Sequence, residues 1–84
     1  NVRTLNQHTN GVTSLVINKD NELISGSYRE IKIWNLKTGQ VKRTLIQHND
    51  WVSSLVAKND NELISGSYDN TIKIWNMGTG EVIS

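Results

Sequence analysis

Apolar and polar positions alternate along this chain in short segments rich in Val, Ile, Thr, Trp and Tyr, which turn-forming residues separate. Such segments favour β-strands, because a strand turns successive side chains to opposite faces, whereas an amphipathic helix needs apolar positions three and four residues apart. We therefore expect an all-β fold. The expected strands cover residues 12–17, 22–25, 31–34, 41–45, 52–57, 62–65, 71–75 and 81–84.

Two kinds of turn separate these strands. Residues 18–21 and 58–61 consist mainly of Asp and Asn, which tolerate the left-handed backbone of a tight hairpin. Residues 37–40 and 78–81 contain glycine, which adopts a positive φ without steric cost. Both kinds of turn predict antiparallel hairpins.

The chain contains an internal repeat. Residues 20–28 recur unchanged at residues 60–68, an offset of 40, and residues 31–35 match residues 72–76 at an offset of 41. The first copy is therefore one residue shorter just after Tyr28. A period of this length is typical of propeller blades.

The residues of each copy occur in the order of a known family. A histidine precedes a hairpin with Ser-Gly-Ser, and Ile-Lys-Ile-Trp-Asn follows. This order resembles the WD40 repeat, with Gln-His in place of the usual Gly-His and Trp-Asn in place of Trp-Asp. The resemblance covers essentially all of the chain and implies two four-stranded antiparallel propeller blades in one domain, 1–84. The first repeat would cover about residues 1–40 and the second about residues 41–84.

The resemblance also implies a buried hydrogen-bond chain in each blade. In the second copy the indole of Trp75 would donate to Ser65, Ser65 would bond His48, and His48 would donate to Asp69, so that every buried donor has an acceptor.

The first copy offers Trp34, Ser25 and His8 for the same chain, but only Arg29 and Glu30 stand where the aspartate is expected. Either Glu30 reaches His8 from the shorter turn, or this blade has a looser top edge with lower order in residues 28–31.

A serine, a histidine and an aspartate in one blade also resemble a nucleophilic triad. A triad needs an exposed hydroxyl beside an oxyanion hole, whereas this serine would be held in a strand between an indole and an imidazole. The sequence shows no paired carboxylates, metal-ligand cluster or phosphate-binding glycine loop. We therefore expect no enzyme and no cofactor.

Aromatic and polar residues in the turns at one end of the blades are candidates for partner binding, because such side chains combine contact area with polar tips. This expected rim consists of Tyr28, Arg29, Trp51, Tyr68, Asn10 and Asp50. For Trp51 the alternative is that its ring packs over the neighbouring blade. Lys32 and Lys73 are expected to be solvated.

Charge and composition argue against two classes of binding partner. Nine Lys and Arg against eight Asp and Glu give a net charge of +1 without a basic run, and no apolar stretch approaches the length of a membrane span. We expect neither a nucleic-acid nor a membrane partner. The chain has no cysteine and begins with Asn1, so we expect a processed protein or a segment of a longer one. Its compartment stays undetermined, with an intracellular one as the expectation.

Two blades leave an apolar face open at each end, and repeat proteins need about three or more units for stability. The sequence near Thr4 resembles the end of the outer strand of residues 40–45, while residues 82–84 resemble its start. We expect copies to join head to tail through this strand, as four chains with eight blades or, as the second possibility, three chains with six.

The expected function is a protein-binding or peptide-binding scaffold. An engineered or excised fragment and a lectin-like glycan binder are the alternatives.

Overall fold

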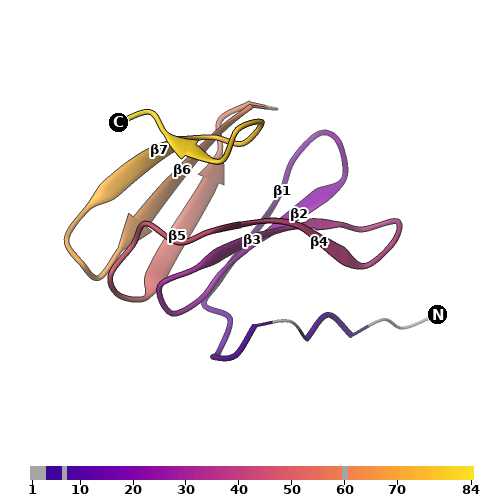
Figure 1. Cartoon of the computed structure of the whole chain (residues 1–84), viewed down its shortest axis with the longest axis horizontal. Coiled ribbons are helices and arrows are strands. Elements are labelled where there is room, and N and C mark those ends of the chain that lie inside the picture. Colours follow the sequence, from indigo (N-terminus) through magenta and orange to yellow (C-terminus); the bar gives the residue numbers. More distant parts are fainter. Residues whose placement is uncertain (1–3, 7, 60) are drawn as a thin grey trace.

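The computed structural model describes residues 4–6, 8–59 and 61–84. These residues form two four-stranded antiparallel sheets that stand side by side as propeller blades, without a helix in the described ranges (Figure 1). The first sheet contains β1 (Ser14–Ile17), β2 (Glu22–Gly26), β3 (Ile31–Asn35) and β4 (Gln40–Leu45). The second contains β5 (Val52–Ala57), β6 (Glu62–Ser67), β7 (Ile72–Asn76) and β8 (Glu81–Val82).

Each sheet is a simple meander in chain order, β1-β2-β3-β4 and β5-β6-β7-β8. The register is the same in both: Leu23 lies opposite Trp34 as Leu63 lies opposite Trp75. The expected strands are present with shifted ends. The first begins at Ser14 instead of Val12, and the last ends at Val82 although Ser84 still accepts a hydrogen bond from the N–H of Ile74.

The turns use the residues that the sequence singles out. Asn21 has a φ of 60°, and Gly39 and Gly80 have φ values of 75° and 80°. The side-chain oxygen of Asn35 accepts hydrogen bonds from the N–H groups of Lys37 and Thr38, and Asn76 does the same in the second blade. Only a side-chain oxygen is used, so asparagine fills this turn position as well as an aspartate would.

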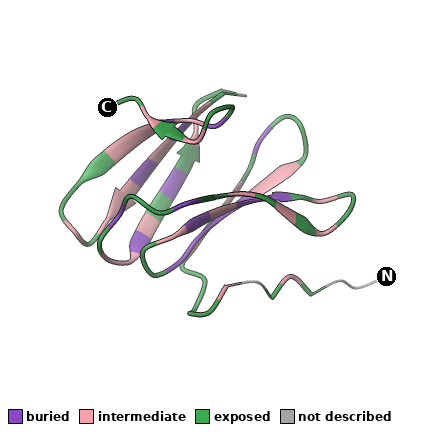
Figure 2. Cartoon of the chain, in the orientation of Figure 1, coloured by how far each residue is buried: buried purple, intermediate pink, exposed green. Residues whose placement is uncertain are grey.

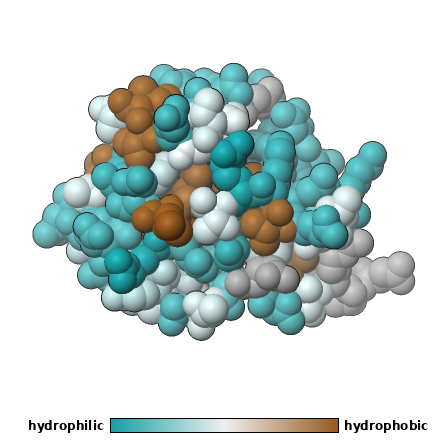
Figure 3. Space-filling model, viewed as in Figure 1, coloured by the Kyte–Doolittle hydropathy of each residue, from teal (hydrophilic) through white to brown (hydrophobic). Residues whose placement is uncertain are grey.

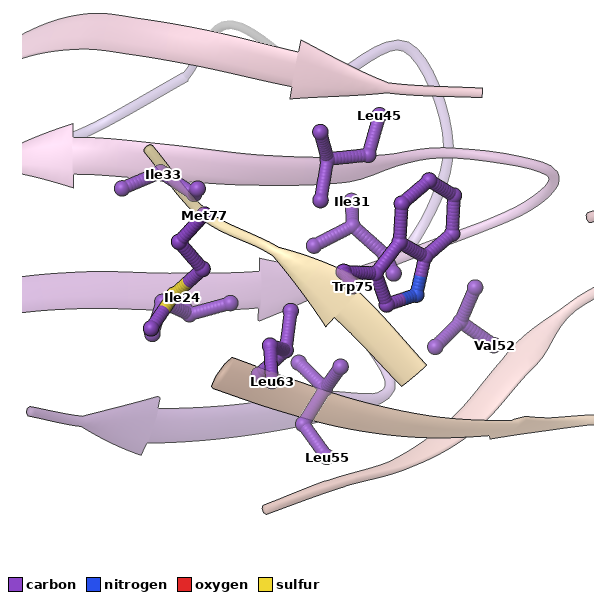
Figure 4. Close-up of a cluster of buried hydrophobic side chains, with 9 residues drawn as sticks. All are labelled: Ile24, Ile31, Ile33, Leu45, Val52, Leu55, Leu63, Trp75 and Met77. Carbon is purple, nitrogen blue, oxygen red and sulfur yellow. The ribbon is translucent and has the colours of Figure 1, made fainter. Parts of the chain in front are cut away.

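The core lies between the two sheets (Figure 4). One face of the first sheet meets the opposite face of the second, and the side chains point toward one another across the gap. The first sheet contributes Ile24, Ile31, Ile33 and Leu45, and the second contributes Val52, Leu55, Leu63, Trp75 and Met77. The buried positions of Figure 2 follow the strands, while most turn residues are exposed.

A polar clamp on the outer edge joins the blades. Arg43 of β4 donates from both guanidinium nitrogens across the gap to the carbonyl oxygens of Gly78 and Thr79, each at 2.9 Å. Because two donors of one planar group bond two successive carbonyls, the clamp sets the angle between the sheets as well as their distance.

The surface in the view of Figure 3 is mostly hydrophilic with a few separate apolar patches. In the described part of the chain, no helix is long and apolar enough to cross a membrane. Arg3 of the expected joining strand, Gln7 of the first Gln-His pair and Asp60 of the repeated string lie outside the described residues.

Candidate functional site

The second blade holds a continuous buried hydrogen-bond chain. The indole Nε1 of Trp75 donates to Oγ of Ser65 over 2.7 Å, and this oxygen lies 2.7 Å from Nε2 of His48. Nδ1 of His48 lies 3.0 Å from a carboxylate oxygen of Asp69. A neutral imidazole protonated on Nδ1 satisfies all four groups, since Ser65 then accepts from the indole and donates to Nε2. The structure thus brings together the four residues that the resemblance implies.

Asp69 is held as a carboxylate by the turn around it. Its oxygens accept from the hydroxyl and the N–H of Thr71 and from the N–H of Asn49. The hydroxyl of Thr71 is the largest influence, and together with the bonds from Asn49 and His48 it outweighs partial burial and lowers the pKa of Asp69 far below its ordinary value.

The first blade builds the same chain with a different acid. Trp34 donates to Ser25 over 2.8 Å, Ser25 lies 2.6 Å from Nε2 of His8, and Nδ1 of His8 lies 2.6 Å from a carboxylate oxygen of Glu30. Glu30 therefore reaches His8 from the shorter turn.

Backbone hydrogen bonds explain why a glutamate fits there. The carbonyl of Glu30 accepts from the N–H of Ser27, as the carbonyl of Thr71 accepts from Ser67, so Glu30 stands at the position of Thr71. The residue missing from the first blade is the counterpart of Asp69. A glutamate one position further along spans the gap with its extra methylene. Arg29 takes the left-handed position of Asn70, with φ values of 66° and 71°.

These networks occupy the hydroxyls of both serines. Ser65 is fully buried and Ser25 is 2% exposed, and each hydroxyl already bonds an indole and an imidazole. An attacking hydroxyl needs access to substrate. The described residues also contain no cluster of three His, Cys, Asp or Glu side chains that would hold a metal ion.

Of the expected rim residues, Tyr28, Arg29, Asp50 and Trp51 meet at the junction between the two blades. The rings of Tyr28 and Trp51 lie 5.3 Å apart at 60°, and the N–H of Arg29 donates to the carbonyl of Asp50. Trp51 therefore packs on the neighbouring blade, as its alternative reading has it, and stays half-exposed. Tyr68 is 68% exposed, and Arg29 and Asn10 are exposed as well.

A shallow depression lies beside this contact and is lined by Tyr28, Arg29, Glu30 and Ile46. It combines a guanidinium, a carboxylate, a phenol ring and an aliphatic side chain that is 71% exposed.

One sequence-based expectation was wrong, and one contact was not predicted. The side chain of Lys32 is only 13% exposed, because Nζ donates to Thr44 over 3.1 Å and lies 4.0 Å from Glu30, so its description as a solvated position was wrong. Arg43 was not singled out, because its acceptors are backbone carbonyls, which carry no signature in the sequence.

Known proteins resemble the chain in sequence and structure. The family model "WD domain, G-beta repeat" matches residues 1–35 and 39–76. The computationally designed proteins Ika4 and Ika8 superpose with TM-scores of 0.84 at 36% identity, over 95% of this chain and 49% and 25% of theirs. The WD40 β-propeller domain of Doa1 superposes with a TM-score of 0.85 at 32% identity, over 94% of this chain and 27% of that one. The chain thus spans half or a quarter of these neighbours. No curated protein matches it. On the two matched repeats, the chain belongs to the WD40 repeat family.

Proposed function

We propose that the chain is a non-catalytic propeller scaffold whose rim binds a peptide segment of a protein partner. One observation carries this proposal. The serine and histidine of each blade bond each other in a largely buried network, while Tyr28, Arg29 and Tyr68 are exposed in the turns that follow the second strand of each blade. Aromatic and arginine side chains dominate the binding energy of protein interfaces, because they bury a large area and keep a polar tip.

The same proposal includes closure of the scaffold by copies of the chain. An unpaired blade face would leave apolar side chains in water, and a ring removes both open faces at once. Two blades per chain give an even ring. The matched segment of two blades is about a quarter of Ika8 and of the Doa1 domain, which supports a ring of about four such segments, hence four chains with eight blades. Three chains with six blades are the second possibility.

The size of the assembly is tested by light scattering at several chain concentrations. A mass of four chains at every concentration supports the eight-blade ring, and a mass of three supports the six-blade ring. A chain that stays monomeric contradicts closure by copies.

Binding at the rim is tested with an array of immobilised peptides. We expect selective binding that the exchanges Tyr68→Ala and Arg29→Ala weaken about tenfold each, in line with the loss of an interface anchor. Lys19→Ala is the control, because Lys19 is exposed in the turn at the opposite end of β2. Equal loss in the control, or binding to a glycan array instead, would contradict the peptide-binding rim.

The second candidate is an engineered fragment without a ligand of its own. Two of the neighbours in structure are designed proteins, which supports this alternative. It requires that neither the peptide array nor the glycan array retains the chain.

A further inference from the structure

The two open faces of the chain repeat most of the apolar residues of the two faces that meet inside it. Inside the chain, the first blade packs on the second with the side chains of Val16, Ile24, Ile31 and Ile33. The repeat places the same residue types on the outer face of the second blade, at Val56, Ile64, Ile72 and Ile74. The second blade covers the first with Val52, Leu55, Leu63 and Trp75, and the outer face of the first blade carries Val12, Leu15, Leu23 and Trp34.

Burial separates these identical residues. Ile31 is 1% exposed inside the junction, whereas its counterpart Ile72 is 74% exposed. Leu55 is 9% exposed, whereas Leu15 is 62% exposed. For these two pairs, the residue that a blade covers is buried and its counterpart on the outer face is open, whereas Trp34 on the outer face of the first blade is buried without a covering blade.

We infer that a second copy of this chain docks the outer face of its first blade on the outer face of the second blade, in the geometry of the internal junction. The inference rests on the proposed scaffold and specifies its junction. Such a contact is head to tail, because the two surfaces differ, and it leaves one open face at each end of any chain of copies.

The backbone edge of β7 supports the same partner. In the first blade the outer strand runs as far as the pairs Ile31 with Leu45 and Lys32 with Thr44. In the second blade β8 pairs only with Trp75 and Asn76, and the described residues place no strand beside Ile72 and Lys73. Thr4-Leu5 repeats Thr44-Leu45, so this segment of the docking copy fits the vacant edge in register.

One contact of the internal junction has no counterpart in the junction between copies. The hydroxyl of Ser67 donates to the carbonyl of Trp51, as the hydroxyl of Ser27 donates to the carbonyl of Gly11, so Gly11 stands at the position of Trp51 in the first blade. The junction between copies therefore lacks the aromatic contact that Trp51 makes inside the chain.

One-sided variants test this inference. Leu15→Asp blocks the outer face of the first blade and Ile72→Asp that of the second. Both residues are exposed in the single chain, so neither exchange removes a buried side chain from it. Lys19→Asp at an exposed turn is the control for added negative charge.

We expect the unmodified chain and the Lys19→Asp control to form the large species, and each one-sided variant alone to be monomeric by light scattering with an unchanged circular dichroism spectrum. An equimolar mixture of the two variants should form a species of two chains and nothing larger, because only one intact junction is available. The inference would be overturned if either variant associated with itself. It would also be overturned if the mixture stayed monomeric while the unmodified chain assembled. Both results would leave the proposed ring standing. A monomeric unmodified chain would overturn both.

Discussion

Gly26 of β2 faces Val52 of β5 across the internal junction so closely that a methyl group on Gly26 would lie 2.8 Å from Cγ1 of Val52. The same methyl would lie 2.5 Å from Oγ of Ser14. Overpacking of a filled core costs about 1 to 3 kcal/mol. We therefore expect Gly26→Ala to lower the free energy of unfolding by about this amount in urea titrations at fixed protein concentration.

The control for this exchange is Gly66→Ala, the same position of the second blade. A methyl there would meet only Oγ of Ser54, at 2.8 Å, and no side chain of a neighbouring blade within the chain. We expect a smaller loss when the comparison is made in the monomeric Ile72→Asp background. Equal losses in the two variants would show that contact with Val52 is not the cause.

The pH dependence of stability should depend on Asp69. Its pKa is lower in the folded chain than the ordinary 3.8, mainly because Thr71 donates to the carboxylate, so folding favours the ionised form. This stabilisation is complete above the ordinary value and is lost as the pH falls below it. Thermal melts between pH 2 and 7 should show a steep acid limb that Asp69→Asn makes shallower. Glu81→Gln, at an exposed position, is the control for one lost negative charge.

The free energy of unfolding should depend more on the length of the side chain at position 30 than on its charge. Glu30→Asp withdraws the carboxylate from His8 by one methylene and leaves a half-buried imidazole nitrogen without its acceptor, at a cost of about 1 to 3 kcal/mol. Glu30→Gln keeps an acceptor oxygen at the same reach and should cost less. Urea titration gives the free energies, and ¹⁵N spectra of His8 report the tautomer. A larger loss for the glutamine variant than for the aspartate variant would contradict this role.

Gly11→Trp should strengthen the junction between copies. A Cβ on Gly11 would meet no atom nearer than the ring of Trp51 at 4.0 Å, so the first atom of a side chain causes no overlap within the chain. At the junction the new indole would cover Tyr68 of the other copy as Trp51 covers Tyr28, and an aromatic pair contributes about 0.5 to 1.5 kcal/mol. Gly11→Trp is placed in the Ile72→Asp chain, and this chain is mixed with the Leu15→Asp chain. The dissociation constant of the resulting dimer, measured by sedimentation, should be about two- to tenfold lower than without Gly11→Trp. Gly11→Ala in the same chain should leave it unchanged.

The fold was predictable because the repeat, the turn residues and the alternation of apolar positions all indicate the same hairpins. The hydrogen-bond chain of Trp75, Ser65, His48 and Asp69 was implied by the resemblance to the WD40 repeat. Glu30 was left open between two readings, since only the backbone bond from Ser27 shows that it stands at the position of Thr71. The burial of Lys32 was missed because strand alternation does not show that Thr44 and Glu30 lie beside it.

The shorter turn of the first blade has a consequence for stoichiometry. Arg29 belongs only to this turn, and the longer turn of the second blade has Asp69 and Asn70 in its place. Both turns carry a carboxylate that bonds a histidine, Glu30 in the first blade and Asp69 in the second. In a ring of such chains, turns with and without a guanidinium therefore alternate around the rim. A ligand that reads the guanidinium of Arg29 would saturate at one molecule per chain, which is half the number of blades.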